Sequence, residues 1–250
     1  MNAFAESLAT AWALIAGADA QLLQVVGLSL GVSGTACLLA AAVGLAAGAA
    51  LAVLRFPGRR AVLVLLNTLL ALPSVVVGLV VYLLLSRSGP LGEWGLLFTP
   101  GAMVIAQTVL VVPVVAALTR EAIAGTWKAN GEQLLSLGTG RPAAALLLLW
   151  DERLTVLTVL LAAFGRAISE VGAVMIVGGN IAGHTRVMTT AIALETSKGD
   201  LPLALALGIV LLSVVLFLNA LIAVLRGWST RHGDGEDRAA AVPASGAAHG

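Results

Sequence analysis

Five long apolar stretches constrain this chain more than any other feature of its sequence. They cover residues 25–54, 61–85, 101–119, 154–177 and 201–225. A transmembrane helix needs about 20 mostly apolar residues to cross the hydrocarbon core of a bilayer, and each stretch is near that length or longer. The stretches are continuous and rich in Ala and Leu, without the alternation of a membrane β-barrel. They predict an all-α membrane protein with about five transmembrane helices.

The composition leads to the same class of protein. Hydrophobic residues make up 59% of the chain and charged residues 11%, whereas soluble domains are about 45–50% apolar and about 25% charged. Charged groups this scarce cannot cover a globular surface with solvated side chains. The formal net charge of +1 is not gathered into a basic patch, which argues against a nucleic-acid partner. The expected surrounding is a lipid bilayer.

The basic residues predict which helix ends face the cytoplasm. Ten of the 14 Lys and Arg residues follow the first stretch, separate the third from the fourth, or follow the fifth. Cytoplasmic loops carry an excess of Lys and Arg, so these segments are expected inside the cell, with the N-terminus outside and the C-terminus inside. Residues 1–24 are expected to hold a helix in the outer interface, anchored by Trp12, with a sixth span as the alternative.

Glycine and proline residues inside the stretches predict local features of the helices. Pairs of glycines four residues apart allow two helix backbones to approach closely. The first stretch holds two such pairs, Gly27 with Gly31 and Gly44 with Gly48. Pro73 and Pro113 lie inside the second and third stretches and are expected to kink them.

The polar segment over residues 120–153 is too long to be a simple turn between two spans. Within it, residues 132–138 (EQLLSLG) are predicted to form a short amphipathic helix that ends at Gly138 in the left-handed conformation. A second apolar run over 143–150 returns the chain to the bilayer. Helices across the base of a bundle commonly dock a partner, whereas a lone glutamate such as Glu132 is ordinarily a solvated surface residue.

Two motifs resemble a known family of transport proteins. Residues 132–138 resemble the EAA motif of permease subunits of type I ABC importers, with Gln133 and Leu134 in place of its two alanines. Residues 163–172 (AFGRAISEVG) are similar to the F-x-R-x-x-x-E-x-G stretch of molybdate, sulfate and tungstate permeases. Residues 178–200 look most like tungstate permeases. The resemblance extends from the first span to about Arg226.

The resemblance implies a type I ABC permease fold over residues 25–226, which follows the N-terminal interfacial segment over 1–24. Few large apolar residues follow Arg231, so a disordered cytoplasmic tail is expected over 227–250. It implies a non-catalytic, multi-pass subunit of an ATP-driven importer in the bacterial inner (plasma) membrane, moving a tetrahedral oxyanion. Tungstate is the first expectation, and molybdate or sulfate is the alternative. The implied partners are an ATP-binding ABC subunit, an extracytoplasmic substrate-binding protein and a second copy of the chain in a homodimer. No cofactor and no metal site are expected.

Arg166 and Glu170 are the charged residues that the fourth stretch carries in its interior. An isolated charge at the centre of a transmembrane helix costs at least ~2.5–3.5 kcal/mol. The two residues are spaced i, i+4, so they share one face of a helix and are expected to pair. Two hypotheses follow: the pair gates the anion path, or it braces the bundle.

Polar residues between 180 and 200 are expected at the outer mouth of the protein. Their N–H and O–H groups suit a tetrahedral oxyanion, and a contact with the binding protein is the alternative. The residues concerned are Asn180, Thr185, Arg186, Thr189 and Thr190. Residues 187–196 are predicted to form a short helix. At the opposite end, the resemblance implies that Glu132 and Gly138 couple the permease to its ATPase subunit.

Missing motifs limit the other functions. The sequence has no G-x-x-x-x-G-K-[ST] phosphate loop, so ATP hydrolysis is expected in a separate subunit. It also has no H-E-x-x-H or G-x-S-x-G motif, which disfavours an intramembrane enzyme. A proton-coupled secondary carrier remains an alternative, and its carboxylate relay would rest on Glu170.

Overall fold

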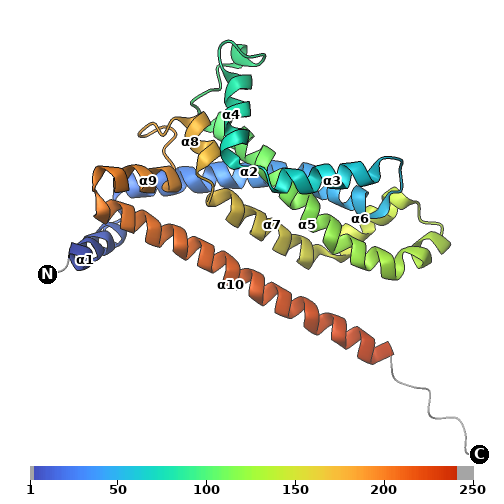
Figure 1. Cartoon of the computed structure of the whole chain (residues 1–250). Helices are drawn as coiled ribbons and strands as arrows, with labels where there is room; N and C mark the ends of the chain where they lie inside the picture. Colours follow the sequence, from blue (N-terminus) through green and yellow to red (C-terminus); the bar gives the residue numbers. More distant parts are fainter. Residues whose placement is uncertain (1–2, 241–250) are drawn as a thin grey trace, which may run out of the picture.

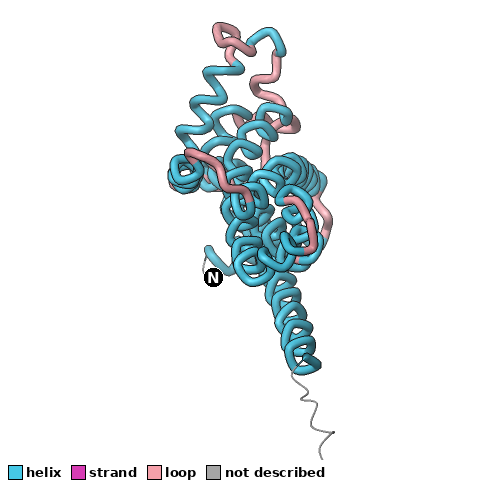
Figure 2. Tube along the Cα trace, turned by 90° about the vertical axis from the view of Figure 1, so that its right-hand side faces the viewer, coloured by secondary structure: helices cyan, strands magenta, loops and turns pink. Residues whose placement is uncertain are grey.

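The computed structural model describes residues 3–240, which form helices joined by short turns and, in this range, no strand (Figures 1 and 2). The helices are α1 (Ala3–Ala16), α2 (Ala20–Val53), α3 (Arg59–Leu70), α4 (Ser74–Leu85), the 3₁₀ turn η1 (Gly92–Trp94), α5 (Pro100–Ser136), α6 (Arg141–Asp151), α7 (Arg153–Ile168), α8 (Gly172–Gly178), α9 (Met188–Lys198) and α10 (Leu201–Ala240). The prediction of an all-α fold is confirmed.

Within residues 3–240, three helices are long and apolar enough to cross a membrane as single units: α2, α5 and residues Leu201–Leu225 of α10. Two further spans are broken, since α3 and α4 meet at 100° and α7 and α8 meet at 58°. With each bent pair counted as one span, the structure contains the five predicted spans. Pro73 stands at the break between α3 and α4, where its ring and its missing N–H prevent the helix from continuing. α5 runs continuously past Pro113.

The predicted separate helix over residues 132–138 is wrong, because those residues up to Ser136 are the end of α5. No proline lies between Thr119 and Glu132, and a formed helix extends at low cost through residues that do not break it. The predicted end at Gly138 is confirmed. This residue has φ +80°, and the N–H of Thr139 donates to the carbonyl of Leu134 at 3.2 Å, which closes the helix end.

The centre of the molecule is the contact between α2 and α5. A Cβ atom at Gly48 would lie 2.5 Å from the carbonyl oxygen of Ala116, and one at Gly44 would lie 2.7 Å from Cβ of Val115. The second glycine pair therefore permits the close approach that its spacing predicts. A Cβ atom added at Gly27 or Gly31 would meet nothing within 4 Å, so the first glycine pair does not lie against a neighbouring helix.

Gly48→Val is expected to lower the thermal unfolding temperature of the purified chain by about 5 °C or more, because overpacking a core costs about 1–3 kcal/mol. The valine side chain would have to displace the α5 backbone, which cannot rotate away as a flexible side chain can. Thermal denaturation in detergent measures the shift. Gly27→Val is the matched control on the same helix, and equal melting of the two variants would contradict the assigned contact.

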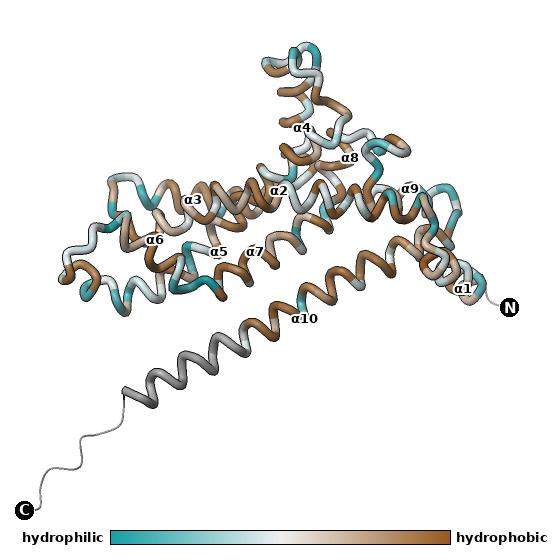
Figure 3. Tube along the Cα trace, turned by 180° about the vertical axis from the view of Figure 1, so that it is seen from behind, coloured by the Kyte–Doolittle hydropathy of each residue, from teal (hydrophilic) through white to brown (hydrophobic). Residues whose placement is uncertain are grey.

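The N-terminal helix packs against the first part of the last helix, outside this centre (Figure 1). α1 has 14 residues, too few to cross a bilayer, and it lies against α10 with Ala11 fully buried. Trp12 is 65% exposed, and its position in the outer interface stays a prediction. α10 diverges from the other helices toward its C-terminal end, and its colouring is strongly apolar over the spanning part (Figures 1 and 3). Leu216 and Phe217 there are 71% and 68% exposed.

α10 extends farther than the sequence predicts. The segment expected as a disordered tail, 227–250, is helical as far as Ala240. No proline interrupts the chain between Pro202 and Pro243, so the helix has no strong stop signal in this region. Residues 241–250 lie outside the described residues.

Candidate functional site

The two intramembrane charges lie at the break between α7 and α8. Arg166 is in the last turn of α7, and Glu170 is in the turn before α8. The guanidinium Nη1 of Arg166 lies 2.8 Å from Oε2 of Glu170, so the predicted pairing is confirmed. Their spacing had predicted that the two residues share one continuous helix. This is wrong, because α7 ends before Glu170. Their exposure is unequal, since the Glu170 side chain is 4% exposed and the Arg166 side chain 48%.

The surroundings of Glu170 explain the break and hold the carboxylate in place. Its Oε1 accepts from the backbone N–H of Ala173 at 3.3 Å, so the side chain satisfies a free donor in the first turn of α8. The Ser74 hydroxyl at the start of α4 also contacts the carboxylate. The hydroxyl of Thr189 donates to the backbone carbonyl of Glu170 at 2.7 Å. Glu170 therefore connects α4, α7, α8 and α9 at one point.

Gln107 on α5 is a neighbour of this pair that the sequence analysis missed. It is 3% exposed, and its Nε2 donates to the carbonyl of Ala167 at 3.0 Å, near the end of α7. Its Oε1 is buried without a hydrogen-bond partner and lines a narrow space together with Arg166 and Glu170. The sequence contained one signal for this residue, since Gln107 is a polar amide inside an apolar span. The site thus combines a fixed carboxylate, a half-exposed guanidinium and one vacant amide oxygen.

The predicted donors at 185–190 are largely occupied by the backbone of their own segment. The hydroxyl of Thr185 donates to Gly178 O at 2.5 Å and accepts from the N–H of Ile181 at 2.9 Å. The hydroxyl of Thr190 accepts from the N–H of Val187 at 3.2 Å and lies 3.1 Å from its carbonyl. Both threonines are almost fully buried. In this conformation they hold the 178–187 loop and the start of α9. The predicted helix over 187–196 is confirmed as α9.

Asn180 and Arg186 complete this outer segment. Asn180 adopts a positive φ of 51°, and its Nδ2 donates to Thr190 O at 3.3 Å while its Oδ1 is buried without a partner. Nη1 of Arg186 lies 3.7 Å from Oε1 of Glu195, which also contacts Nζ of Lys198 at 3.0 Å. Glu195 is 4% exposed and was not predicted. One buried carboxylate thus faces two cations, and the Asp200 carboxylate follows directly after α9, so the charges at this end of the helix balance.

The structure brings Arg166, Glu170 and Thr189 together and connects them to the outer segment through α8 and α9. Glu132 and Gly138 lie far away, at the other end of α5 (Figure 1). Gln107 and Glu132 are 25 positions apart on this single helix, so about 37 Å separates the paired charges from the far end of α5.

That far end of α5 continues into α6, and we call residues 132–152, which end just before α7, the elbow. Ala145 and Leu148 of α6 are buried against α2 and α5. Glu152 accepts from the hydroxyls of Thr126 at 2.5 Å and Thr155 at 2.7 Å, which ties α5 to α7. Large apolar side chains of the elbow are nonetheless exposed, by 40–75%: Leu135, Leu137, Leu146, Leu147 and Trp150. A rigid support with an exposed apolar surface suits the docking of a partner.

The chain is similar to known permeases over most of its length. No protein-family model matches the chain. The tungstate uptake system permease protein TupB of Peptoclostridium acidaminophilum is 43% identical over 230 residues, which cover 90% of this chain and 99% of TupB. A probable anion ABC transporter permease protein of Haloferax volcanii is 44% identical over 210 residues, covering 82% and 90% of the two chains. The sulfate transport system permease protein CysT of Escherichia coli is 29% identical over 171 residues, covering 66% and 62%.

Proposed function

This chain belongs to the permease family of ABC transporters, and from that premise we propose that it is the membrane-spanning subunit of an importer for tungstate. It is a multi-pass plasma-membrane protein and a transport component rather than a catalyst. The assignment of tungstate as the substrate rests on the sequence identity with a tungstate uptake permease over nearly the whole chain. The lower identity to sulfate permeases makes the chemically similar sulfate or molybdate the second candidate.

Arg166 supplies the positive charge that an oxyanion needs at membrane depth. Its guanidinium is half exposed and makes one of the described hydrogen bonds, to Glu170, so other N–H groups are available to an anion. A guanidinium binds a tetrahedral oxyanion through two parallel N–H bonds. Glu170 competes for the same guanidinium, which keeps the anion weakly bound and able to leave. The pair acts as a gate that the anion opens by replacing Glu170 as the partner of Arg166.

The elbow connects this gate to an ATP-hydrolysing partner subunit. Its exposed leucines and Trp150 form the docking surface, and Glu132 lies exposed in the last turn of α5 beside them. α5 transmits the movement, because one helix carries both Glu132 and Gln107, whose amide holds the end of α7. Closure of the partner on ATP thus shifts the α7–α8 break and its charges.

Two copies of the chain form the complete path, together with an extracytoplasmic binding protein that delivers the anion. The apolar faces of α4 and α10 support this arrangement, because Val75, Leu83 and Leu216 are between 56% and 71% exposed. Side chains of this kind need lipid or a second subunit around them. The outer segment faces the delivered anion or its binding protein through its exposed residues 181–184. Asn180, Thr185 and Arg186 hold the shape of this segment.

Uptake by the reconstituted transporter tests the function. We expect tungstate to enter vesicles that hold the permease, its ATPase subunit and its binding protein only when ATP is supplied, and vanadate to stop the uptake. Competition by molybdate and sulfate ranks the three oxyanions. Uptake driven by a pH gradient without ATP would instead identify a secondary carrier, and uptake of sulfate in preference to tungstate would identify the second candidate.

A further inference from the structure

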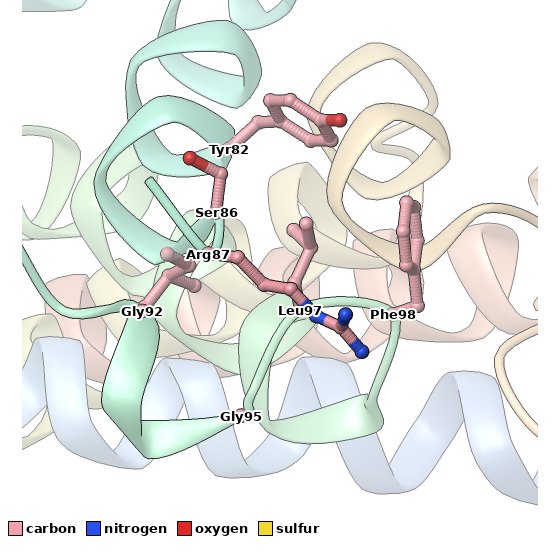
Figure 4. A pocket seen from close by; sticks show the side chains of 8 residues that line it. Tyr82, Ser86, Arg87, Gly92, Gly95, Leu97 and Phe98 are labelled. Atoms are coloured by element: carbon pink, nitrogen blue, oxygen red, sulfur yellow. The ribbon is translucent and has the colours of Figure 1, made fainter. Parts of the chain in front are cut away.

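A cavity of about 520 Å³ lies at the tip of α4, away from the Arg166–Glu170 pair (Figure 4). Its walls come from the end of α4 and from the loop that leads to α5. The lining residues are Tyr82, Leu85, Ser86, Arg87, Gly92, Gly95, Leu97 and Phe98. The volume is in the range of small-molecule sites, which combine apolar walls with a few polar groups.

The loop that forms this cavity is tightly folded onto the end of α4. The N–H of Leu91 donates to Leu84 O at 3.0 Å, and the N–H of Gly89 donates to Ser86 O at 2.8 Å. A Cβ at Gly89 would clash with the carbonyl oxygen of Leu83, and one at Gly92 would clash with that of Ser86. These backbone contacts fix the shape of the loop, and therefore the shape of the cavity wall that the loop forms.

Phe98 forms one wall in an unusual conformation. Its φ is +62°, in the left-handed region that a bulky side chain rarely adopts. Its N–H donates to Val177 O at 3.0 Å, and its ring packs edge-on against Tyr82 with the ring centroids 6.2 Å apart. Strained backbone of this kind persists where surrounding structure fixes it, and it is concentrated at functional sites.

Arg87 is the charged residue of the cavity lining. Its side chain extends across the cavity toward Phe98, while the Ser86 hydroxyl and the Tyr82 ring belong to the α4 side (Figure 4). No carboxylate of the described residues lies within 4.0 Å of the Arg87 guanidinium. Arg87 is itself exposed at the rim of the cavity, so its guanidinium is open to an anion that enters from the solvent.

We propose that this cavity is a receiving site for tetrahedral oxyanions, with Arg87 as its anion-binding residue, at the outer end of the path to Arg166. The proposal rests on the proposed function and on the predicted orientation of the loop. One short element connects the two sites: Phe98 in the cavity wall bonds to Val177 in α8, and the seven residues of α8 begin after the turn that holds Glu170. An anion released from a binding protein would thus meet Arg87 before it meets Arg166.

Cysteine protection in the full-length chain tests the site directly. The native Cys37 is buried, so Cys37→Ala leaves a background in which Ser86→Cys places one thiol in the cavity wall. We expect tungstate to slow the labelling of this thiol by a cationic methanethiosulfonate reagent. Adding Arg87→Gln is expected to raise the tungstate concentration needed for half protection by about tenfold or more, as loss of a charge-assisted bond predicts. Arg87→Lys keeps the charge without the paired N–H groups. The tungstate concentration for half protection should therefore lie between the values with Arg87 and with Arg87→Gln.

Ser136→Cys at the end of α5 is the control thiol, because it is exposed and remote from the cavity. Its labelling should not respond to tungstate in either background. The inference is overturned if Ser86→Cys is labelled equally with and without tungstate, or if Arg87→Gln leaves the protection unchanged. It is also overturned if Arg87→Gln weakens only the association of the binding protein.

ATP-driven uptake separates this inference from the proposed function. In the assembled transporter, Arg87→Gln is expected to raise KM for tungstate about tenfold or more and to leave the maximal rate close to that of the unchanged protein. Absence of ATP-driven uptake by the unchanged protein would contradict the proposed function. Normal uptake together with an unprotected Ser86→Cys would contradict the receiving site alone.

Discussion

The double substitution Arg166→Gln/Glu170→Gln is expected to leave the assembled permease folded and to reduce tungstate uptake by about 100-fold. Glu170 is buried and Arg166 half exposed. Exchanging such a pair for neutral groups is often close to neutral for stability, because the cost of desolvating the charges disappears with their attraction. The two amides can still hydrogen-bond each other, so a bracing role would survive. The positive charge offered to the anion is lost, and a charge-assisted contact is worth about 1.5–3 kcal/mol. Uptake and thermal unfolding, measured on the same preparation, test both parts.

Two further variants define the role of each partner in that pair. Glu170→Gln alone removes the competitor of the anion, so KM for tungstate is expected to fall and the maximal rate to fall with it, since release becomes slow. The exchange Arg166→Glu/Glu170→Arg restores an ion pair but presents a carboxylate where Arg166 is half exposed. We expect it to remain inactive. Wild-type uptake by the double glutamine variant or by the exchanged pair would make the pair a structural brace.

Gly138→Val is expected to uncouple ATP hydrolysis from transport and to lower tungstate uptake per ATP hydrolysed by more than about tenfold. The residue has φ +80°, a conformation that costs an L-residue roughly 1–2 kcal/mol and a β-branched one more. A Cβ there would meet nothing within 4 Å, so the effect comes from the backbone and not from a clash. Reshaping the end of α5 would move Glu132 and the exposed leucines away from the partner subunit. Parallel assays of ATPase activity and uptake measure the ratio.

Gly138→Asn is the matched control for that variant. Asparagine tolerates the left-handed conformation better than other residues with a Cβ, so this variant should keep most of the coupling. Equal ratios of uptake to hydrolysis in Gly138→Val and the unchanged protein would show that the elbow does not transmit the movement. A valine variant that binds the ATPase subunit normally but fails to transport would locate the defect in transmission rather than in assembly.

Several features of the site could be predicted because the physical rule behind each is local. Arg166 and Glu170 had to pair, since neither charge is tolerated alone inside a span, and the structure contains the pair. Gly138 had to end a helix, since it follows a run of helix-forming residues without a competing stop. Helix α9 was likewise predictable from its own residues.

Other features depend on partners far away in the chain, so no local pattern could reveal them. Gln107 reaches a carbonyl that is 60 residues away, and Thr189 reaches one that is 19 residues away. The hydroxyls of Thr185 and Thr190 look available in the sequence, yet the folded loop uses both. Residues 132–136 looked like a separate helix, yet they continue α5 because nothing before them stops it.

The sequence by itself determined that this chain is a bundle of apolar helices with one charged pair inside and a polar segment at one end. Hydrophobic length, the cost of buried charge and the backbone limits of proline and glycine act within one stretch of chain. Only the tertiary structure decided that two spans are broken and that Gly44 and Gly48 rather than Gly27 and Gly31 meet α5. It also decided that Arg87 lines a cavity and forms no ion pair with a described carboxylate. These outcomes depend on which distant surfaces come into contact, and packing fixes that choice only when the whole chain has folded.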